Sequence, residues 1–310
     1  MVVVAAAGFG TLSLSARRLG EYDITALPYV TWRALFGGGL VLLLFLGLVA
    51  AGRARVPAVA TVPGGQRWAL LAAGVCGAVT NLAAFSALEL TTVALMLIVF
   101  YTFPAIVTIG AVRLYGERID GRRALALALS SAGLLLVVLA PVLGQSGISV
   151  NLWGVVLALI AAVGQAVFLL IAGRGFSSVP SMLSTAVVML SAGVIYVVIV
   201  LATGQVSAVA IPFDVPAAWP WIVLTATVGA AIPTMSLVSA TRRIGPGRTS
   251  ILMMLEPVVG VLLAGLFLAE HPSPLQLLGG VMVITAGVLL QLPARGRAAP
   301  VIAEAPVQTI

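Results

Sequence analysis

Ten apolar segments, joined by short polar connections, fill almost the whole chain and limit its fold more than any other feature. They lie near residues 2–16, 28–51, 68–88, 93–112, 124–143, 152–172, 182–203, 217–239, 249–269 and 275–292. A helix that crosses a lipid bilayer needs about 20 mainly apolar residues. Since 61% of the 310 residues are hydrophobic and 8% are charged, no stretch remains for a soluble domain. The sequence therefore predicts an all-α polytopic membrane protein with ten transmembrane helices.

The arginine residues predict how the chain is oriented in the membrane. All 16 basic residues are arginine. If the N-terminus is cytoplasmic, Arg17, Arg18 and Arg33 lie toward the outer side and the other thirteen lie toward the inner side. Cytoplasmic loops of membrane proteins carry an excess of basic residues, so we expect both termini in the cytoplasm. Residues 295–310 combine prolines and alanines without periodicity and are predicted to form a disordered cytoplasmic tail.

The chain lacks the residue patterns of several enzyme classes. The absence of lysine excludes a Walker A phosphate loop and Schiff-base chemistry. His271 and Cys76 are the single histidine and the single cysteine, and no HExxH or G-x-S-x-G pattern is present. We therefore expect no enzyme and no metal or other cofactor. We also expect no nucleic-acid partner, because the net charge of +7 comes from arginines that flank apolar segments.

The chain contains an internal repeat. FPAIVTIGAVRLYGE (Phe103 to Glu117) and EPVVGVLLAGLFLAE (Glu256 to Glu270) both place a proline and a glutamate 13 residues apart. Each is followed by an Ala-Gly pair in the next apolar segment, so the fourth and fifth segments resemble the ninth and tenth. At an offset of 156 residues, further matches join Gly8 to Gly164, Ala16 to Ala172, Arg18 to Arg174 and Gly37 to Gly193.

The repeat predicts two halves with opposite orientations in the membrane. Each half, residues 1–143 and residues 144–294, holds five predicted helices. Because five is odd, the second half enters the bilayer from the side opposite to the first. This arrangement is an inverted repeat, which is typical of carriers.

On these motifs the chain resembles the EamA-type drug/metabolite transporter (DMT) superfamily, whose members carry two such halves. With its Glu256-Pro257 pair, it is similar to bacterial amino-acid exporters of the YddG type. The resemblance implies export of small metabolites, such as amino acids, from the cytoplasm across the bacterial inner membrane. It also implies a central cavity lined by the first, third, fourth, sixth, eighth and ninth helices. The expected partners are a small-molecule substrate and the lipid bilayer, with protons as a further candidate.

Polar and aromatic residues of those six helices, with one methionine, are the candidate substrate-binding residues. They are Thr11, Asn81, Phe85, Tyr101, Gln165, Phe168, Thr234, Met254 and Glu256. Two interpretations remain open for them. The amides and hydroxyls could bind substrate or join helices by hydrogen bonds, and the aromatic rings could line the cavity or only pack.

Glu256 is the one carboxylate predicted to lie deep in the membrane. It follows Arg248 by eight residues, about 12 Å along a helix, within a hydrocarbon core about 30 Å thick. A charged side chain at this depth cannot face lipid without a large energetic cost. It either faces the cavity, where it could bind a substrate ammonium group or exchange a proton, or it is hydrogen-bonded to protein. The matching position in the first half is Phe103, so twofold packing alone does not require a carboxylate.

Three prolines lie inside predicted helices. Pro104 and Pro257 occupy matching positions in the two halves, and each removes a helix hydrogen bond, as Pro233 does in the eighth helix. Such paired interruptions indicate a hinge or a midplane site, although prolines are also common in membrane helices. We predict Pro104 and Pro257 as hinges.

Trp32 and Arg33 lie near the outer end of the second predicted helix. We expect an interfacial tryptophan and an arginine that extends to the membrane surface, with a gate contact as the alternative. For the function of the whole chain, a passive channel, a structural partner protein, or an exporter of other amphipathic solutes or drugs remains the alternative to an amino-acid carrier.

Overall fold

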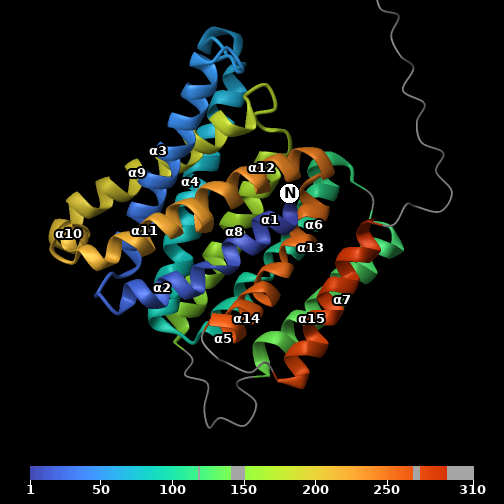
Figure 1. The fold of residues 1–310 in the computed structure, drawn as a ribbon. Coiled ribbons are helices and arrows are strands. Elements are labelled where there is room, and N and C mark those ends of the chain that lie inside the picture. The colour runs from blue at the N-terminus through green and yellow to red at the C-terminus, as the bar shows by residue number, and fades with distance from the viewer. Residues whose placement is uncertain (118, 141–150, 268–272, 292–310) are drawn as a thin grey trace, which may run out of the picture.

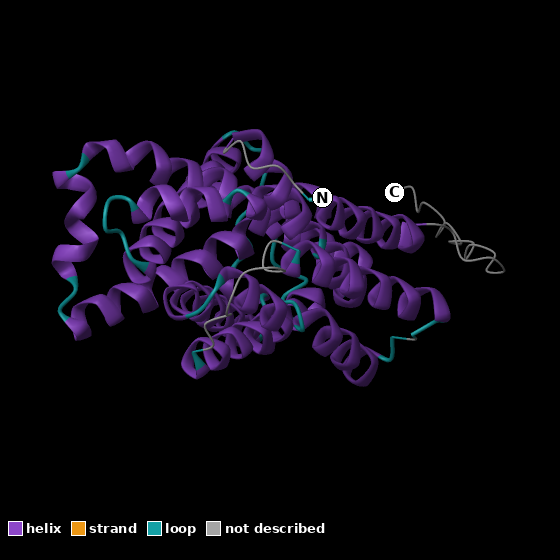
Figure 2. Ribbon diagram, turned by 90° about the horizontal axis from the view of Figure 1, so that it is seen from below, coloured by secondary structure: helices purple, strands orange, loops and turns teal. Residues whose placement is uncertain are grey.

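The computed structural model describes residues 1–117, 119–140, 151–267 and 273–291, where helices joined by loops make up the secondary structure (Figure 2). The first half contains α1 (Val2–Gly10), α2 (Leu12–Gly20), α3 (Ala26–Ala50), α4 (Gly64–Leu90), α5 (Val93–Phe100), α6 (Phe103–Tyr115) and α7 (Gly121–Leu139). The second half contains α8 (Leu152–Arg174), α9 (Ser181–Thr203), α10 (Val206–Asp214), α11 (Trp219–Ala226), α12 (Ile232–Ile244), α13 (Pro246–Met253), α14 (Leu255–Phe267) and α15 (Pro274–Gln291).

These helices form ten membrane spans within the described residues, as the sequence predicts. Four spans consist of two consecutive helices, namely α1–α2, α5–α6, α11–α12 and α13–α14. The predicted tail at residues 295–310, Glu270, His271 and the last three residues of the fifth predicted span lie outside the described residues.

The packing of the spans relates the two halves. The fifth and tenth spans, α7 and α15, lie side by side, and the second and seventh, α3 and α9, also pack together (Figure 1). The third span, α4, packs on the sixth, α8, while the first span, through α1, packs on α12 of the eighth. A twofold axis that exchanges the halves maps the α7–α15 contact and the α3–α9 contact onto themselves. It maps the α4–α8 contact onto the α1–α12 contact. With five spans in each half, the second is threaded oppositely to the first, so the fold is an inverted repeat.

Glycines allow the fifth and tenth spans to touch through their backbones. A Cβ atom added to Gly133 of α7 would lie 2.6 Å from the carbonyl oxygen of Gly279 of α15. A Cβ added to Gly279 would in turn meet the carbonyl oxygen of Gly133. Small residues at such contacts let membrane helices approach closely, which favours association where no hydrophobic effect can drive it.

The fourth and ninth spans break at equivalent positions, just before Pro104 and Pro257. Proline lacks an N–H donor, so the helical hydrogen-bond ladder cannot continue through it. In α5–α6 the amide of Thr102 donates to the Val99 oxygen at 3.2 Å, and in α13–α14 the amide of Met254 donates to the Ile251 oxygen at 3.1 Å. Both breaks therefore contain a tightened turn with bonds three residues apart, as in a 3₁₀-helix.

Two further breaks have no counterpart in the other half. A π-helical turn at Thr227–Ala231 precedes Pro233 and separates α11 from α12. Thr11 separates α1 from α2, and this break lies against the π-helical turn, close to Gly229. The equivalent spans, α4 and α8, are continuous. The first and eighth spans are thus distorted together, where they pack on each other.

Candidate functional site

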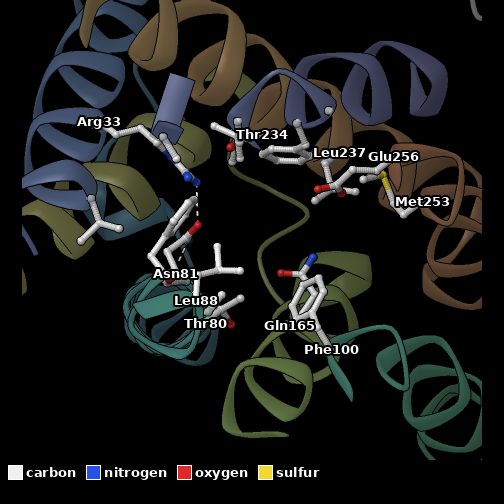
Figure 3. Close-up of a pocket in the computed structure, with 18 of the residues that line it drawn as sticks. Arg33, Thr80, Asn81, Leu88, Phe100, Gln165, Thr234, Leu237, Met253 and Glu256 are labelled. Atoms are coloured by element: carbon white, nitrogen blue, oxygen red, sulfur yellow. Dashed lines mark hydrogen bonds between the residues drawn. The ribbon is translucent and has the colours of Figure 1, made fainter. Parts of the chain in front are cut away.

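The spans surround a cavity of about 500 Å³. Its wall is mainly apolar and includes several phenylalanines, among them Phe9, Phe100 and Phe168. The side chains with polar groups in the wall are Arg33, Thr80, Asn81, Gln165, Tyr196, Thr234 and Glu256. Several of them converge on the same space from different helices (Figure 3). Apolar pockets with a few convergent polar groups are typical of small-molecule sites.

The cavity occupies one end of the bundle. It reaches residues 30–34 near the start of α3, residues 77–88 in the second part of α4, and residues 93–103 around α5. On the predicted orientation, all three regions face the outer half of the membrane.

The opposite end is closed by packed side chains. Val107 of α6, Leu169 of α8 and Val238 of α12 are fully buried in one cluster. Arg242 of α12 fastens the connection between α8 and α9, because its guanidinium donates to the Val179 carbonyl at 2.7 Å and to the Phe176 carbonyl at 3.1 Å.

Most of the predicted substrate-binding residues line this cavity. They are Asn81, Phe85, Gln165, Phe168, Thr234 and Glu256. Gln165 and Thr234 lie in the middle of the sixth and eighth spans, and the side chains of both point into the cavity (Figure 3).

Three predicted residues lie outside the cavity wall, contrary to the expectation. Thr11 sits at the break of the first span, where its hydroxyl donates to the Gly8 carbonyl at 2.7 Å and faces the eighth span. Met254 is fully buried at the bend between α13 and α14, and its neighbour Met253 lines the cavity instead. Tyr101 is buried behind the wall, 4% exposed, next to Glu256.

Glu256 lies in the first turn of α14, at the break before Pro257. Its carboxyl group faces the cavity (Figure 3). The partial positive charge at a helix N-terminus favours a carboxylate there. Tyr101 lies close enough for its hydroxyl to interact with the carboxyl electrostatically. The hydroxyl, however, does not meet the geometry of a hydrogen bond with any described residue. The Glu256 carboxyl therefore lies between the Tyr101 hydroxyl and the cavity.

Arg33 is a cavity residue that the sequence interpretation missed. It is 7% exposed, so the expected extension to the membrane surface is wrong. Its Nη2 atom donates to Asn81 Oδ1 at 2.6 Å, and its guanidinium carbon lies 5.5 Å from the centroid of the Phe85 ring. Asn81 is fixed in turn by a bond from Nδ2 to the Gly77 carbonyl at 2.7 Å. The signal in the sequence was an arginine seven residues into a span, a depth of about 10 Å.

Arg33 and Glu256 place opposite charges on opposite sides of the cavity (Figure 3). Their charges interact, but no salt bridge between the two is found among the described residues, which do hold the ion pairs Arg18–Glu21 and Arg123–Glu117. The Nη1 atom of Arg33 is buried and has no hydrogen-bond partner among the described residues.

Ten spans in two repeated halves around a central cavity define a multi-pass membrane protein. The model of the EamA-like transporter family matches residues 1–139 and 152–292. The chain therefore belongs to the EamA-like transporter family and to the drug/metabolite transporter superfamily, whose substrates are small molecules.

A likeness to a solved structure supports the fold alone. A crystal structure of another protein is similar to this chain with a TM-score of 0.71 and 19% sequence identity. The likeness covers 93% of this chain and 95% of the other. No curated protein matches the chain by sequence.

Proposed function

We propose that this protein exports small amphipathic metabolites, with amino acids as the leading class, from the cytoplasm across the bacterial inner membrane by alternating access. Each half, residues 1–143 and 144–294, supplies five spans to the carrier, and both termini lie in the cytoplasm. The cavity between the two halves carries the proposal. Its volume of about 500 Å³ suits a small metabolite, and its wall combines apolar rings with a few polar groups.

The closed end of the cavity favours a carrier over the alternative of a passive channel. A channel needs a continuous polar path, whereas this cavity ends against the packed layer formed by Val107, Leu169 and Val238. Two oppositely threaded halves can exchange conformations, which would close the outer end and open the inner one. The structure then corresponds to the outward-facing state of the cycle.

The substrate class is inferred from the charge of the cavity wall. When Glu256 is ionised, Arg33 and Glu256 contribute one positive and one negative charge, so the formal charge of the wall is close to zero. A neutral or zwitterionic solute fits this wall better than a multiply charged nucleotide sugar. Pro104 and Pro257, at the two equivalent breaks, are the proposed hinges. Protons are a candidate coupling ion, with Glu256 as the carboxyl group in the described cavity wall that would carry them.

The proposal is tested with the purified full-length protein in proteoliposomes. Flux of labelled amino acids, nucleosides and cationic drugs is measured with and without a pH gradient. A carrier predicts saturable flux that is stimulated by unlabelled substrate on the opposite side of the membrane. Flux that does not saturate and shows no such stimulation would identify a channel, and absence of flux for the whole panel would contradict the proposal.

A further inference from the structure

We propose that Arg33 and Glu256 form a two-ended binding site for a zwitterion, in which Arg33 binds the carboxylate of the substrate and Glu256 binds its ammonium group. This inference rests on the proposed transport function and assigns the recognition step to two residues. It predicts that a substrate needs both charges, on a body small and apolar enough for the surrounding wall.

The first observation is the unused bonding capacity of Arg33. Its side chain is more than nine-tenths buried, yet Nη1 has no partner among the described residues, while Nη2 bonds Asn81. A buried donor without a partner destabilises the protein, and a buried charge does so more strongly. Arg33 lines the cavity, and a guanidinium group binds carboxylates through two parallel hydrogen bonds, so a substrate carboxylate in the cavity is a ligand that fits this side chain.

The second observation is that Arg33 is held in place before any ligand binds. Asn81 and Phe85 lie one helical turn apart on α4, and they fix the guanidinium by a hydrogen bond and by ring contact. Tyr29, one turn before Arg33 on α3, packs against the Phe85 ring with centroids 4.6 Å apart. A charged group fixed in this way loses little conformational freedom when a ligand arrives.

The third observation is the position of Glu256 relative to Arg33. The two side chains face each other across the cavity instead of forming a direct ion pair (Figure 3). Each remains available to a group of opposite charge inside the cavity. A zwitterion satisfies both charges at once. A simple amine would leave Arg33 unpaired and add a second positive charge to the cavity. A simple carboxylate would leave Glu256 unpaired and add a second negative charge. The site therefore discriminates against both.

The rest of the wall suits an apolar side chain. Phe9, Phe100, Phe103 and Phe168 line the same cavity. Phe100 and Phe103 also pack against each other, with ring centroids 5.3 Å apart. Aromatic rings offer a large apolar surface to a bound side chain. The site therefore fits amino acids with aromatic or aliphatic side chains.

The test uses probes of equal shape and different charge. L-Phenylalanine, 2-phenylethylamine and 3-phenylpropanoate share one ring, and L-leucine, 3-methylbutylamine and 4-methylpentanoate form a second series. Competition of each probe against the labelled substrate is measured in proteoliposomes. In the natural protein we expect the amino acid of at least one series to compete better than its amine and acid analogues, by a factor of about ten or more. The reason is that each analogue loses one charge-assisted bond.

Two variants assign the two ends of the site. In Arg33→Met the amino acid should no longer compete better than its amine analogue. In Glu256→Gln the amino acid should no longer compete better than its acid analogue. Arg33→Lys should keep the preference with weaker binding, because lysine keeps the charge but loses the paired geometry. Arg18→Met and Glu21→Gln remove a similar pair of charges from an exposed ion pair, 3.2 Å apart, and should change nothing.

Several outcomes would overturn the inference. One is an amine or acid that competes as well as its amino acid in the natural protein. Another is a variant that weakens all three probes of a series equally. Transport of some other solute while neither series competes would also overturn it. These results leave the transport function intact, whereas failure to carry any solute of the flux panel contradicts the proposed function itself. If Arg33→Met does not fold, as judged by gel filtration, Arg33→Lys and Glu256→Gln still decide the outcome.

Discussion

The fourth and ninth spans share a geometry and differ in chemistry. Both break before a proline, and both place the residue before that proline in the cavity wall, Phe103 in the first half and Glu256 in the second. At the offset that joins Gly37 to Gly193, Arg33 corresponds to Met189, which lines the cavity as well. Each half thus supplies one charged residue to the cavity wall, and the equivalent residue of the other half is uncharged. The packing follows the twofold symmetry, while the charges depart from it, which is expected if the charges serve an asymmetric ligand.

The largest effect should come from making the second half like the first. Glu256→Phe places the residue of the first half at the equivalent position, so we expect the protein to fold. Transport should fall about 10- to 100-fold, because the bonds of a charged group to the substrate are lost. The initial flux in proteoliposomes measures this, with Phe103→Leu as the matched control in the other half. Equal flux in Glu256→Phe and the natural protein would show that the asymmetry of charge has no role in transport.

The contact between the fifth and tenth spans gives an intermediate effect and tests the symmetric part of the comparison. Gly133→Ala and Gly279→Ala each force a Cβ against the carbonyl oxygen of the other glycine. Each should lower the free energy of unfolding by about 1–3 kcal/mol, and by similar amounts, since overpacking a tight contact has this effect. Unfolding in detergent, followed by tryptophan fluorescence, provides the measurement.

Gly39→Ala is the control for this contact, because an added Cβ there meets no atom within 4 Å. If the two variants unfold like the Gly39→Ala control, the backbones of α7 and α15 are not in contact.

Replacing the two prolines should have the smallest effect, and the change should be in the transport rate. Pro104→Ala and Pro257→Ala restore an N–H donor at the two equivalent breaks, which should stiffen the hinges and slow turnover severalfold. Apparent substrate affinity should change little. Pro274→Ala is the control, since Pro274 begins α15, where no ladder bond is missing. Turnover equal to that of the control would favour the interpretation that the prolines only pack.

Span lengths and breaks could be predicted from the sequence because bilayer thickness and proline chemistry fix them locally. The rotation of each helix about its axis could not be predicted, and a shift of one residue turns a side chain by about 100°. For this reason Met254 is buried where Met253 lines the cavity, and Arg33 faces inward. Pro233 marked an interruption of the eighth span, but the π-helical form of the turn at Thr227–Ala231, which packs against α1, could not be predicted.

Some cavity residues could still be found from sequence. Asn81 and Gln165 are amides within apolar helices, and such side chains avoid lipid, so they had to face protein or a cavity. The structure places both in the cavity wall.

The central claim is that two oppositely threaded halves enclose one cavity, and the labelling of equivalent loops tests it most directly. Ala58 lies in the exposed connection between the second and third spans, and Gln205 lies in the exposed connection between the seventh and eighth. In a Cys76→Ser background, single cysteines at these positions are treated in intact cells with a thiol reagent that cannot cross the membrane. The account predicts labelling at position 205 and protection at position 58. Labelling of both from the same side would mean parallel repeats and would contradict it.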